Sequence, residues 1–413
     1  MPRRRALLAS LGTAVVAGCI SDEATSPQTD GTATGSPTET EPTETATPGA
    51  PEPPSSIDAD WPRPGYDAGN SNRTDAPGPT DPIAELWSVT ADSQLSQPVL
   101  AGETLYVGSR DGAVLAIDAR TGEERWRQSI GDAAFTPRVV TERLCVPTAS
   151  AIVALDPAEG SEQWRVETPN RADRVDREGK IVEATLLAAS HGLYWVAGEG
   201  HRNEENPTVV SIAPMDGSEQ WRTDIEDPWS RRLFASADAV FVSTNHNAPD
   251  PWRLAAATGV VETEPPGSGA DFEDEWFSRD GTLYSVGPIF GPVEATPADG
   301  GHDWSTDLFG NALSGGVDAV YGDLSDGEQR GLYALAAADG SRRWNVTDVA
   351  TPVSRSVVAG ECVLLRTEEA LRCFDPTDGA ERWSHPVDNI GGRVVVADDL
   401  LYTTRGETVR AFR

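Results

Sequence analysis

The sequence predicts an all-β fold, an eight-bladed β-propeller of four-stranded antiparallel blades, and three observations support this prediction. A turn glycine followed four residues later by a tryptophan recurs along the chain, with successive glycines 38 to 57 residues apart. Between these pairs, short apolar runs alternate with Asp-Gly and similar turns. The two ends of the repeat region carry complementary parts of one further unit. Four short strands repeated with this period are typical of propeller blades.

The first repeat shows the local pattern most clearly. Two apolar runs, residues 105–107 and 113–117, flank the turn Asp111-Gly112. Asp-Gly between apolar alternations favours a tight hairpin, because both central turn positions need positive φ. A second turn at Gly122 leads to Trp126 on the next strand. With a further strand near residues 97–100, the unit has four antiparallel strands.

The tryptophan position recurs eight times, and one occurrence is degenerate because Thr263 follows the turn at Gly259. Trp87 precedes the first full unit without strands of its own, and the chain ends after three strands that lack a fourth. We expect the strand around residues 84–90 to supply it, which closes the ring and removes exposed sheet edges. The seven tryptophans are Trp87, Trp126, Trp164, Trp221, Trp304, Trp344 and Trp383.

Residues 116–126, with the sequence AIDARTGEERW, match the tryptophan-docking repeat of quinoprotein dehydrogenases. The chain therefore resembles the family of quinoprotein-like propellers, which carry repeats named after pyrroloquinoline quinone (PQQ). The resemblance covers about residues 60–413 and includes the lead-in at residues 61–72. It implies that the seven tryptophans pack between neighbouring blades and are structural.

The family includes quinone-dependent enzymes and non-enzymatic scaffolds, and the sequence favours a scaffold. The enzymes use adjacent cysteines stacked on PQQ, a calcium ion and an aspartate base. Here the cysteines are Cys19, Cys145, Cys362 and Cys373, none adjacent, and no calcium-loop or histidine metal spacing is present. The chain resembles BamB-type assembly lipoproteins more closely. We expect no catalytic residue, metal or cofactor, with a PQQ-dependent alcohol or sugar dehydrogenase as the alternative.

The N-terminus predicts export and lipidation. Residues 1–18 combine Arg3-Arg4-Arg5 with an apolar stretch too short to span the ~30 Å core of a bilayer. They resemble a twin-arginine signal peptide ending in a lipobox, with lipid attached to Cys19; a plain secretory signal is the alternative. Residues 19–59, rich in Thr, Ser, Pro and Glu, predict a disordered tether before the propeller at 60–413. We expect a lipid-anchored protein on the outer side of the cell membrane.

The charge is strongly acidic. The formal net charge is −33, and Lys180 is the only lysine. A dense acidic surface almost without lysine is typical of haloarchaeal proteins, which work in salt that screens self-repulsion. An ordinary acidic exported protein is the alternative. Nucleic acid is not an expected partner, because no basic stripe exists to neutralise phosphates.

Nearly all long insertions fall on one side of the predicted ring, in blades three and four. We interpret this side as a binding face for an envelope protein or a small ligand, on a chain that is otherwise monomeric. Tolerated drift of surface loops is the alternative. The proposed contact residues are Arg171, Arg174, Arg177, Lys180, Arg202, Trp229 and Trp252.

Two smaller groups of residues leave alternatives open. Cys362 and Cys373 flank a hairpin turn and can form a disulfide outside the membrane, or remain two buried thiols. The acidic residues Asp271 and Glu273–Glu275 can bind a cation, but a solvated acidic loop is the favoured interpretation.

Overall fold

The computed structural model describes residues 51–168, 186–197, 208–225, 232–243, 251–263, 275–286, 292–298 and 303–413. Residues 50–413 form one compact unit. The described residues contain strands and turns without a helix, so none of them forms an apolar helix long enough to cross a membrane.

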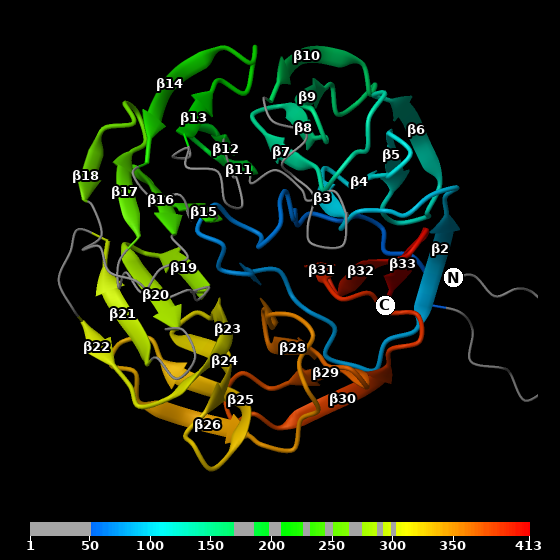
Figure 1. Cartoon of the computed structure of the whole chain (residues 1–413). Coiled ribbons are helices and arrows are strands. Elements are labelled where there is room, and N and C mark those ends of the chain that lie inside the picture. The colour runs from blue at the N-terminus through cyan, green and yellow to red at the C-terminus, as the bar shows by residue number, and fades with distance from the viewer. Residues whose placement is uncertain are drawn as a thin grey trace, which may run out of the picture. The chain divides into compact units, whose positions relative to one another are not determined.

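Eight sheets surround a common axis, and the predicted eight-bladed propeller is confirmed (Figure 1). Each blade runs from an innermost first strand to an outermost fourth strand. The first four blades consist of β3 (Val99–Ala101), β4 (Thr104–Gly108), β5 (Ala113–Asp118) and β6 (Glu124–Ser129); β7 (Arg138–Val140), β8 (Arg143–Pro147), β9 (Ala151–Leu155) and β10 (Glu162–Glu167); β11 (Leu186–Ala189), β12 (Gly192–Ala197), β13 (Thr208–Ile212) and β14 (Glu219–Asp224); and β15 (Arg232–Ala235), β16 (Ala239–Ser243), β17 (Trp252–Ala255) and β18 (Val261–Thr263).

The remaining four blades follow the same order, except that the last takes its fourth strand from the other end of the chain. They consist of β19 (Glu275–Arg279), β20 (Thr282–Val286), β21 (Val293–Pro297) and β22 (Trp304–Ser305); β23 (Phe309–Gly315), β24 (Ala319–Ser325), β25 (Arg330–Ala336) and β26 (Arg342–Val346); β27 (Val357–Ala359), β28 (Cys362–Arg366), β29 (Ala370–Phe374) and β30 (Glu381–Pro386); and β31 (Val394–Ala397), β32 (Leu400–Arg405), β33 (Thr408–Phe412) and β2 (Glu85–Thr90).

The two ends of the chain close the ring, as the sequence predicts. Strand β2 pairs antiparallel with β33, so that Trp87 lies opposite Ala411. A second, unpredicted strand, β1 (Arg73–Thr74), adds in parallel to β27 and makes blade seven five-stranded. Two separate N-terminal segments thus add strands to the last two blades, and the β2–β33 pair closes the ring.

The core lies between blades, because the two faces of each blade pack against different neighbours. Leu105 and Leu115 of blade one cluster with the strands of blade eight. Tyr106 and Val114 point the other way and cluster with blade two. Alternation along each strand sends successive side chains to opposite faces, so a fully apolar strand suits a blade buried on both sides.

The contact that recurs from blade to blade is an indole that packs against the next blade. In seven blades, the tryptophan of the fourth strand donates a hydrogen bond of 2.8–3.1 Å to a backbone carbonyl beyond its own blade. A turn glycine with positive φ lies against the ring: Gly160, for example, covers Trp126. The glycine therefore meets the tryptophan of the preceding blade, not the one four residues later in its own repeat. The bonds are Trp87 to Ala119, Trp126 to Pro157, Trp164 to Pro214, Trp221 to Ala256, Trp304 to Ala337, Trp344 to Pro376 and Trp383 to Pro79.

The cysteine pair left open by the sequence is joined in the structure. Cys362 on β28 and Cys373 on β29 form a disulfide. They are diagonal neighbours, because the register sets Cys373 opposite Leu364. Cys145 is buried and unbonded, and burial raises the pKa of its thiol to about 12.

Candidate functional site

The N-terminal lead-in, residues 58–77, runs once around the inside of the ring, and we call it the axial segment (Figure 1). It forms hydrogen bonds with all eight blades in chain order. The contacts, from blade one to blade eight, are Trp61 with Leu100, Pro62 with Val139, Arg63 with Ala188, Ala68 with Ala235, Gly69 with Ser278, Ser71 with Gly315, Asn72 with Val358 and Pro77 with Asp399.

The axial segment lies near one end of the ring. Its partners Ala235 and Gly315 end their strands next to the turns that join the first and second strands. The amides of Asp58 and Ala59 donate to Asp398, which lies in the corresponding turn of blade eight. The segment is thus hydrogen-bonded beside these short turns. A cavity lies toward the opposite side of the ring, where the first strands begin.

An axial cavity of about 740 Å³ lies beside this segment. Its walls come from the segment and from residues near the start of the first strands, including Leu186, Leu233 and Val394. Volumes of this size are common for small-molecule sites. Among the described lining residues, the ionisable ones are Arg63, Arg138, Arg330, Arg355, Arg393, Asp67 and Asp323.

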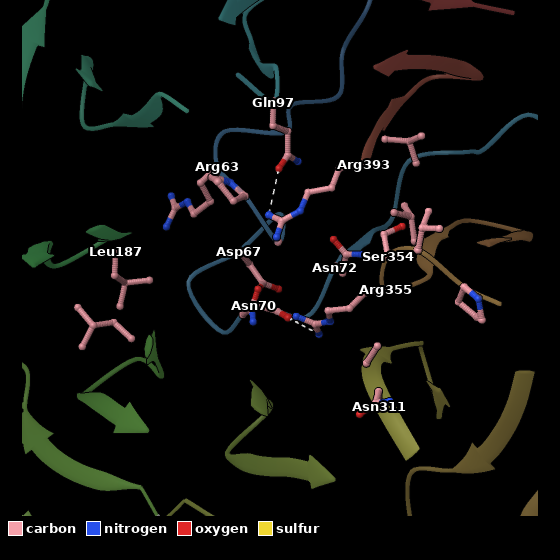
Figure 2. A pocket seen from close by; sticks show the side chains of 18 of the residues that line it. Arg63, Asp67, Asn70, Asn72, Gln97, Leu187, Asn311, Ser354, Arg355 and Arg393 are labelled. Carbon is pink, nitrogen blue, oxygen red and sulfur yellow. Dashed lines mark hydrogen bonds between the residues drawn. The ribbon is translucent and has the colours of Figure 1, made fainter. Parts of the chain in front are cut away.

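Two arginines that line the cavity occupy equivalent positions in neighbouring blades. Arg355 and Arg393 each lie four residues before the alanine that ends the first strand, Ala359 or Ala397. Figure 2 shows both side chains directed toward the middle of the cavity. In blade one Gln97 has the same position, and its Oε1 accepts a hydrogen bond of 3.3 Å from Arg393.

Arg355 also secures the axial segment. Its guanidinium donates to the carbonyl of Leu313 at 2.6 Å and to that of Asn70 at 2.8 Å. Within the part of the chain that the structure describes, the Arg393 side chain donates only to Gln97, while its backbone carbonyl accepts from the Thr403 hydroxyl. The two arginines thus differ in role, because Arg355 supports the fold while Arg393 stands at the edge of the cavity.

Arg63 and Arg138 provide positive charge from blades two and three. Arg63 donates to the carbonyl of Ala188, and its buried Nε has no hydrogen-bond partner among the described residues. Burial lowers the pKa of the Arg63 guanidinium, and repulsion from Arg138 lowers it further against the attraction of Asp67. Arg138 is buried at the start of β7 and donates to the carbonyl of Thr136.

Asp67 is one of the two carboxylates in the described lining of the cavity. It accepts hydrogen bonds from the amide and hydroxyl of Ser71. Burial raises the pKa of Asp67, although the Ser71 bonds and the charges of Arg63 and Arg355 act in the opposite direction. The second lining carboxylate, Asp323, forms an ion pair with Arg330.

Backbone strain concentrates at the same place. Asn70, Asn72 and Ala312 line the cavity with φ values of 61°, 57° and 65°. Asparagine tolerates this left-handed region, whereas alanine rarely adopts it. Ala312 adopts it within a break in the register of β23 and β24. Such strain often marks sites where the surrounding structure fixes a functional geometry.

The arrangement is a concave, positively charged site in an acidic chain. Low-dielectric walls focus the field of the guanidinium groups into the cavity. Planar guanidinium groups bind carboxylates through paired hydrogen bonds. The site can therefore hold an anion, and the side-chain amides of Gln97 and Asn72 can add polar contacts at its edge.

Of the binding-face residues predicted from the sequence, only Trp252 lies within the described residues, and it does not line this cavity. Trp252 lies in β17, is 7% exposed and packs in the core between blades three and four. A partner could not reach it in this position. The other six, Arg171, Arg174, Arg177, Lys180, Arg202 and Trp229, lie outside the described residues, as do Cys19, Asp271, Glu273 and Asp274.

The axial arginines were not predicted from the sequence, although a signal existed. Arg355 and Arg393 stand at equivalent positions before Val-Val-Ala in the last two blades. Alignment of the repeats would have shown a charged residue entering two consecutive inner strands. Arg63 carries no comparable signal, because its position depends on the path of the axial segment.

The fold and the cavity define a repeat propeller of the PQQ-like class with an arginine-lined axial site. A family model described as "Outer membrane protein assembly factor BamB" matches residues 83–228 and 205–412. The chain belongs to this BamB family.

Curated relatives match parts of the propeller. The serine/threonine-protein kinase AfsK of Streptomyces coelicolor is 30% identical over 169 residues, which are 37% of this chain and 19% of the kinase. The BamB protein of Yersinia pestis is 33% identical over 111 residues, 24% of this chain and 28% of that protein. The match thus spans less than a third of each of these relatives.

Two solved structures share the fold at low identity. BamB from Moraxella catarrhalis has a TM-score of 0.59 and 15% identity over 80% of this chain and 100% of that chain. The quinohemoprotein alcohol dehydrogenase of Comamonas testosteroni has a TM-score of 0.60 and 13% identity over 86% and 80% of the two chains. At this identity the likeness concerns the fold alone.

The described lining of the cavity does not fit a bound PQQ. The carboxylates of PQQ would meet arginines, but the described lining contains no aromatic or cysteine side chain to stack on a planar ring. The described residues also contain no cluster of three or more acidic, histidine or cysteine side chains to hold a metal ion.

Proposed function

We propose that this protein is a binding scaffold of the cell envelope, anchored by lipid at Cys19, that holds a partner protein at the mouth of its axial cavity. The observation that carries the proposal is a rigid ring, closed by β2 and bonded to the axial segment, around a cluster of arginines. Membership in the BamB family supports an interaction role.

Rigidity favours this use of the ring. Seven indoles, the β2–β33 pair and the axial segment join the blades, so ordering the site on binding costs little. Arginine is enriched among the residues that dominate binding energies, because it combines apolar area with fixed donors. The axial arginines thus form a preorganised anchor point.

The envelope location rests on two arguments. The lipobox-like sequence ending at Cys19 supports lipid attachment after export. The matched family is described by an outer membrane function, and a scaffold that acts beside a membrane gains effective concentration from an anchor.

The test is capture of a partner by the full-length, membrane-bound protein in its native salt, with cross-linking and mass identification. Arg393→Gln should reduce capture of that partner by tenfold or more, and Arg222→Gln on the outermost strand β14 should leave it unchanged. Absence of any specific partner, together with PQQ-dependent oxidation of an alcohol or sugar by the purified protein, would overturn the proposal in favour of the dehydrogenase.

A further inference from the structure

We propose that Asn345 is an N-glycosylation site of the exported protein and accepts its glycan from a lipid-linked oligosaccharide phosphate. The sequence contains two sequons of the form Asn-X-Ser/Thr, at residues 72–74 and 345–347. Such a sequon is an acceptor for N-linked sugar when it lies on the surface of an exported protein. The proposal goes beyond the scaffold function and rests only on the export that the proposed function includes.

The sequon at residues 345–347 lies on the outer wall of the ring. Asn345 belongs to β26, the strand that ends the sheet of blade six at the rim (Figure 1). Its neighbour Trp344 is buried against the next blade, so the alternation of the strand turns Asn345 toward the opposite face. Asn345 is partly exposed and Thr347 is exposed. Within the part of the chain that the structure describes, no hydrogen bond holds the Asn345 side chain.

The equivalent positions of other blades show that this place on the strand faces solvent. In blade one, Arg127 also follows the docking tryptophan directly, and it lies opposite Leu115 beside a break in register. Asn345 lies opposite Tyr333 beside the same break. In the six other blades where the structure describes this position its residue is exposed: Ser88, Arg127, Arg165, Arg222, Ser305 and Ser384.

Blade six lacks the ion pair that occupies this position in blades one to three. There the arginine after the tryptophan pairs with a glutamate three residues before it, as Arg127 does with Glu124. In β26 the residue three before Asn345 is Arg342, which lies 3.8 Å from Asp326 instead. The side-chain amide of Asn345 is therefore left open to an enzyme that approaches the rim.

The sequon at residues 72–74 is closed to the same reaction. Asn72 lines the axial cavity (Figure 2), and its side-chain amide donates to the backbone carbonyl of Ser356. Thr74 in β1 is 2% exposed, and its hydroxyl accepts from the amide of Ala76. A transferase must reach both the amide and the hydroxyl that define a sequon. Of the two sequons, the folded ring therefore presents only the one at Asn345.

The transfer itself is a substitution at the first sugar of the donor. A bond forms between Nδ2 of Asn345 and C1 of that sugar as the bond between C1 and the phosphate oxygen breaks. The amide gives one proton to a base of the transferase, and the lipid phosphate leaves with the electron pair of the broken bond. The step needs no oxidant or reductant, and the propeller supplies only the acceptor amide.

The experiment is mass spectrometry of the full-length protein purified from the membranes of its native host. The peptide 344–355, released by cleavage after arginine, should carry one glycan attached to Asn345, whereas Asn72 should carry none. Asn345→Gln and Thr347→Ala should each lower the intact mass by that glycan, because either change destroys the sequon. Arg127→Asn is the matched control: it creates a sequon with Ser129 at the equivalent exposed position of blade one, and it should add a second glycan.

The outcomes separate this inference from the proposed function. An unmodified Asn345 in a protein whose Arg127→Asn variant is glycosylated would overturn the inference alone, because that variant has met a transferase. A glycan on Asn72 would overturn the assignment of the open and closed sequons. Absence of sugar from both variants and wild type, with an uncleaved signal, would overturn the inference together with export. A glycan on Asn345 without any captured partner would support the inference and overturn the scaffold function alone.

Discussion

The indole nitrogen of Trp383 donates a 2.8 Å hydrogen bond to the carbonyl oxygen of Pro79, 304 residues earlier in the chain. In the other six tryptophan contacts the acceptor belongs to a turn between the third and fourth strands of the next blade. Blade eight has no such turn, because β33 ends at Phe412 and β2 comes from the N-terminus. Pro79 thus replaces the missing turn and makes the N-terminal segment part of the repeat.

The first prediction concerns this closure. Trp383→Phe should destabilise the protein by about 1–3 kcal/mol, the cost of a buried carbonyl left without its donor together with lost packing. Trp304→Phe removes the equivalent 2.9 Å bond to Ala337 within the continuous part of the ring and serves as the matched control. Equal losses in denaturant unfolding are expected. A much smaller loss for Trp383→Phe would mean that the N-terminal segment is not an integral part of the ring.

The second prediction separates conformational strain from steric exclusion at the turn glycines. Gly160 has φ +73°, and a Cβ there would lie 2.7 Å from the Trp126 ring. Gly406 has φ +62°, and a Cβ there would meet nothing within 4 Å. Gly406→Ala should cost about 1 kcal/mol through the left-handed backbone alone. Gly160→Ala should cost roughly 3 kcal/mol, because overpacking is added; similar losses in both variants would refute the steric role.

The third prediction is a loss of stability at high pH. The hydroxyl of Tyr321 lies 3.4 Å from the carbonyl of Pro376, and burial raises the pKa of this phenol to about 12 from its usual 10.0. Between these values the unfolded chain releases the proton and the folded chain retains it. Stability is therefore full below pH 10.0 and falls as the pH rises toward 12, by roughly 1.4 kcal/mol per pH unit for this group.

Thermal unfolding between these pH values measures this loss of stability, with Tyr321→Phe as the comparison. The variant should show a shallower decline, because one of the buried phenols is gone. Pro376 keeps its bond of 2.9 Å from Trp344, so the variant should remain folded at neutral pH. An unchanged slope would contradict the assigned role of Tyr321.

The fourth prediction concerns the pH dependence of the axial cavity. Burial raises the pKa of Asp67, which faces Arg63, Arg355 and the Ser71 hydroxyl. As the pH falls through that pKa, the carboxylate becomes neutral and the cavity gains net positive charge. Sulfate, whose charge is constant over this range, should then bind more tightly. Asp67→Asn should bind sulfate tightly at every pH, and the same pH dependence in that variant would assign the effect to another group.

The fifth prediction tests the anchor. Cys19→Ser should release the protein from membranes into the medium, because the lipid acceptor is lost while the signal remains. Fractionation of cells and the mass of the mature N-terminus measure the outcome. A Ser variant that stays membrane-bound and uncleaved would show that the anchor lies in another feature of the chain.

The sequence by itself determined the architecture of the ring. The spacing of Gly122, Trp126 and their equivalents predicts eight blades, because turns, strand alternation and the docking position are local patterns that repeat. The orphan strand with Trp87 and the incomplete final unit predict closure by the two ends. These features depend on neighbours within about 40 residues, and so they can be read along the chain.

Only the tertiary structure decided where the chemistry lies. Arg63 and Asp67 lie far in the sequence from Arg355 and Arg393, and the two groups meet because the axial segment circles inside the ring and the first strands converge on the axis. Trp252 shows the converse, since a residue that the sequence placed on a loop is buried in β17. A repeat pattern specifies which strands form, whereas the convergence of separate blades on one cavity depends on closing the ring.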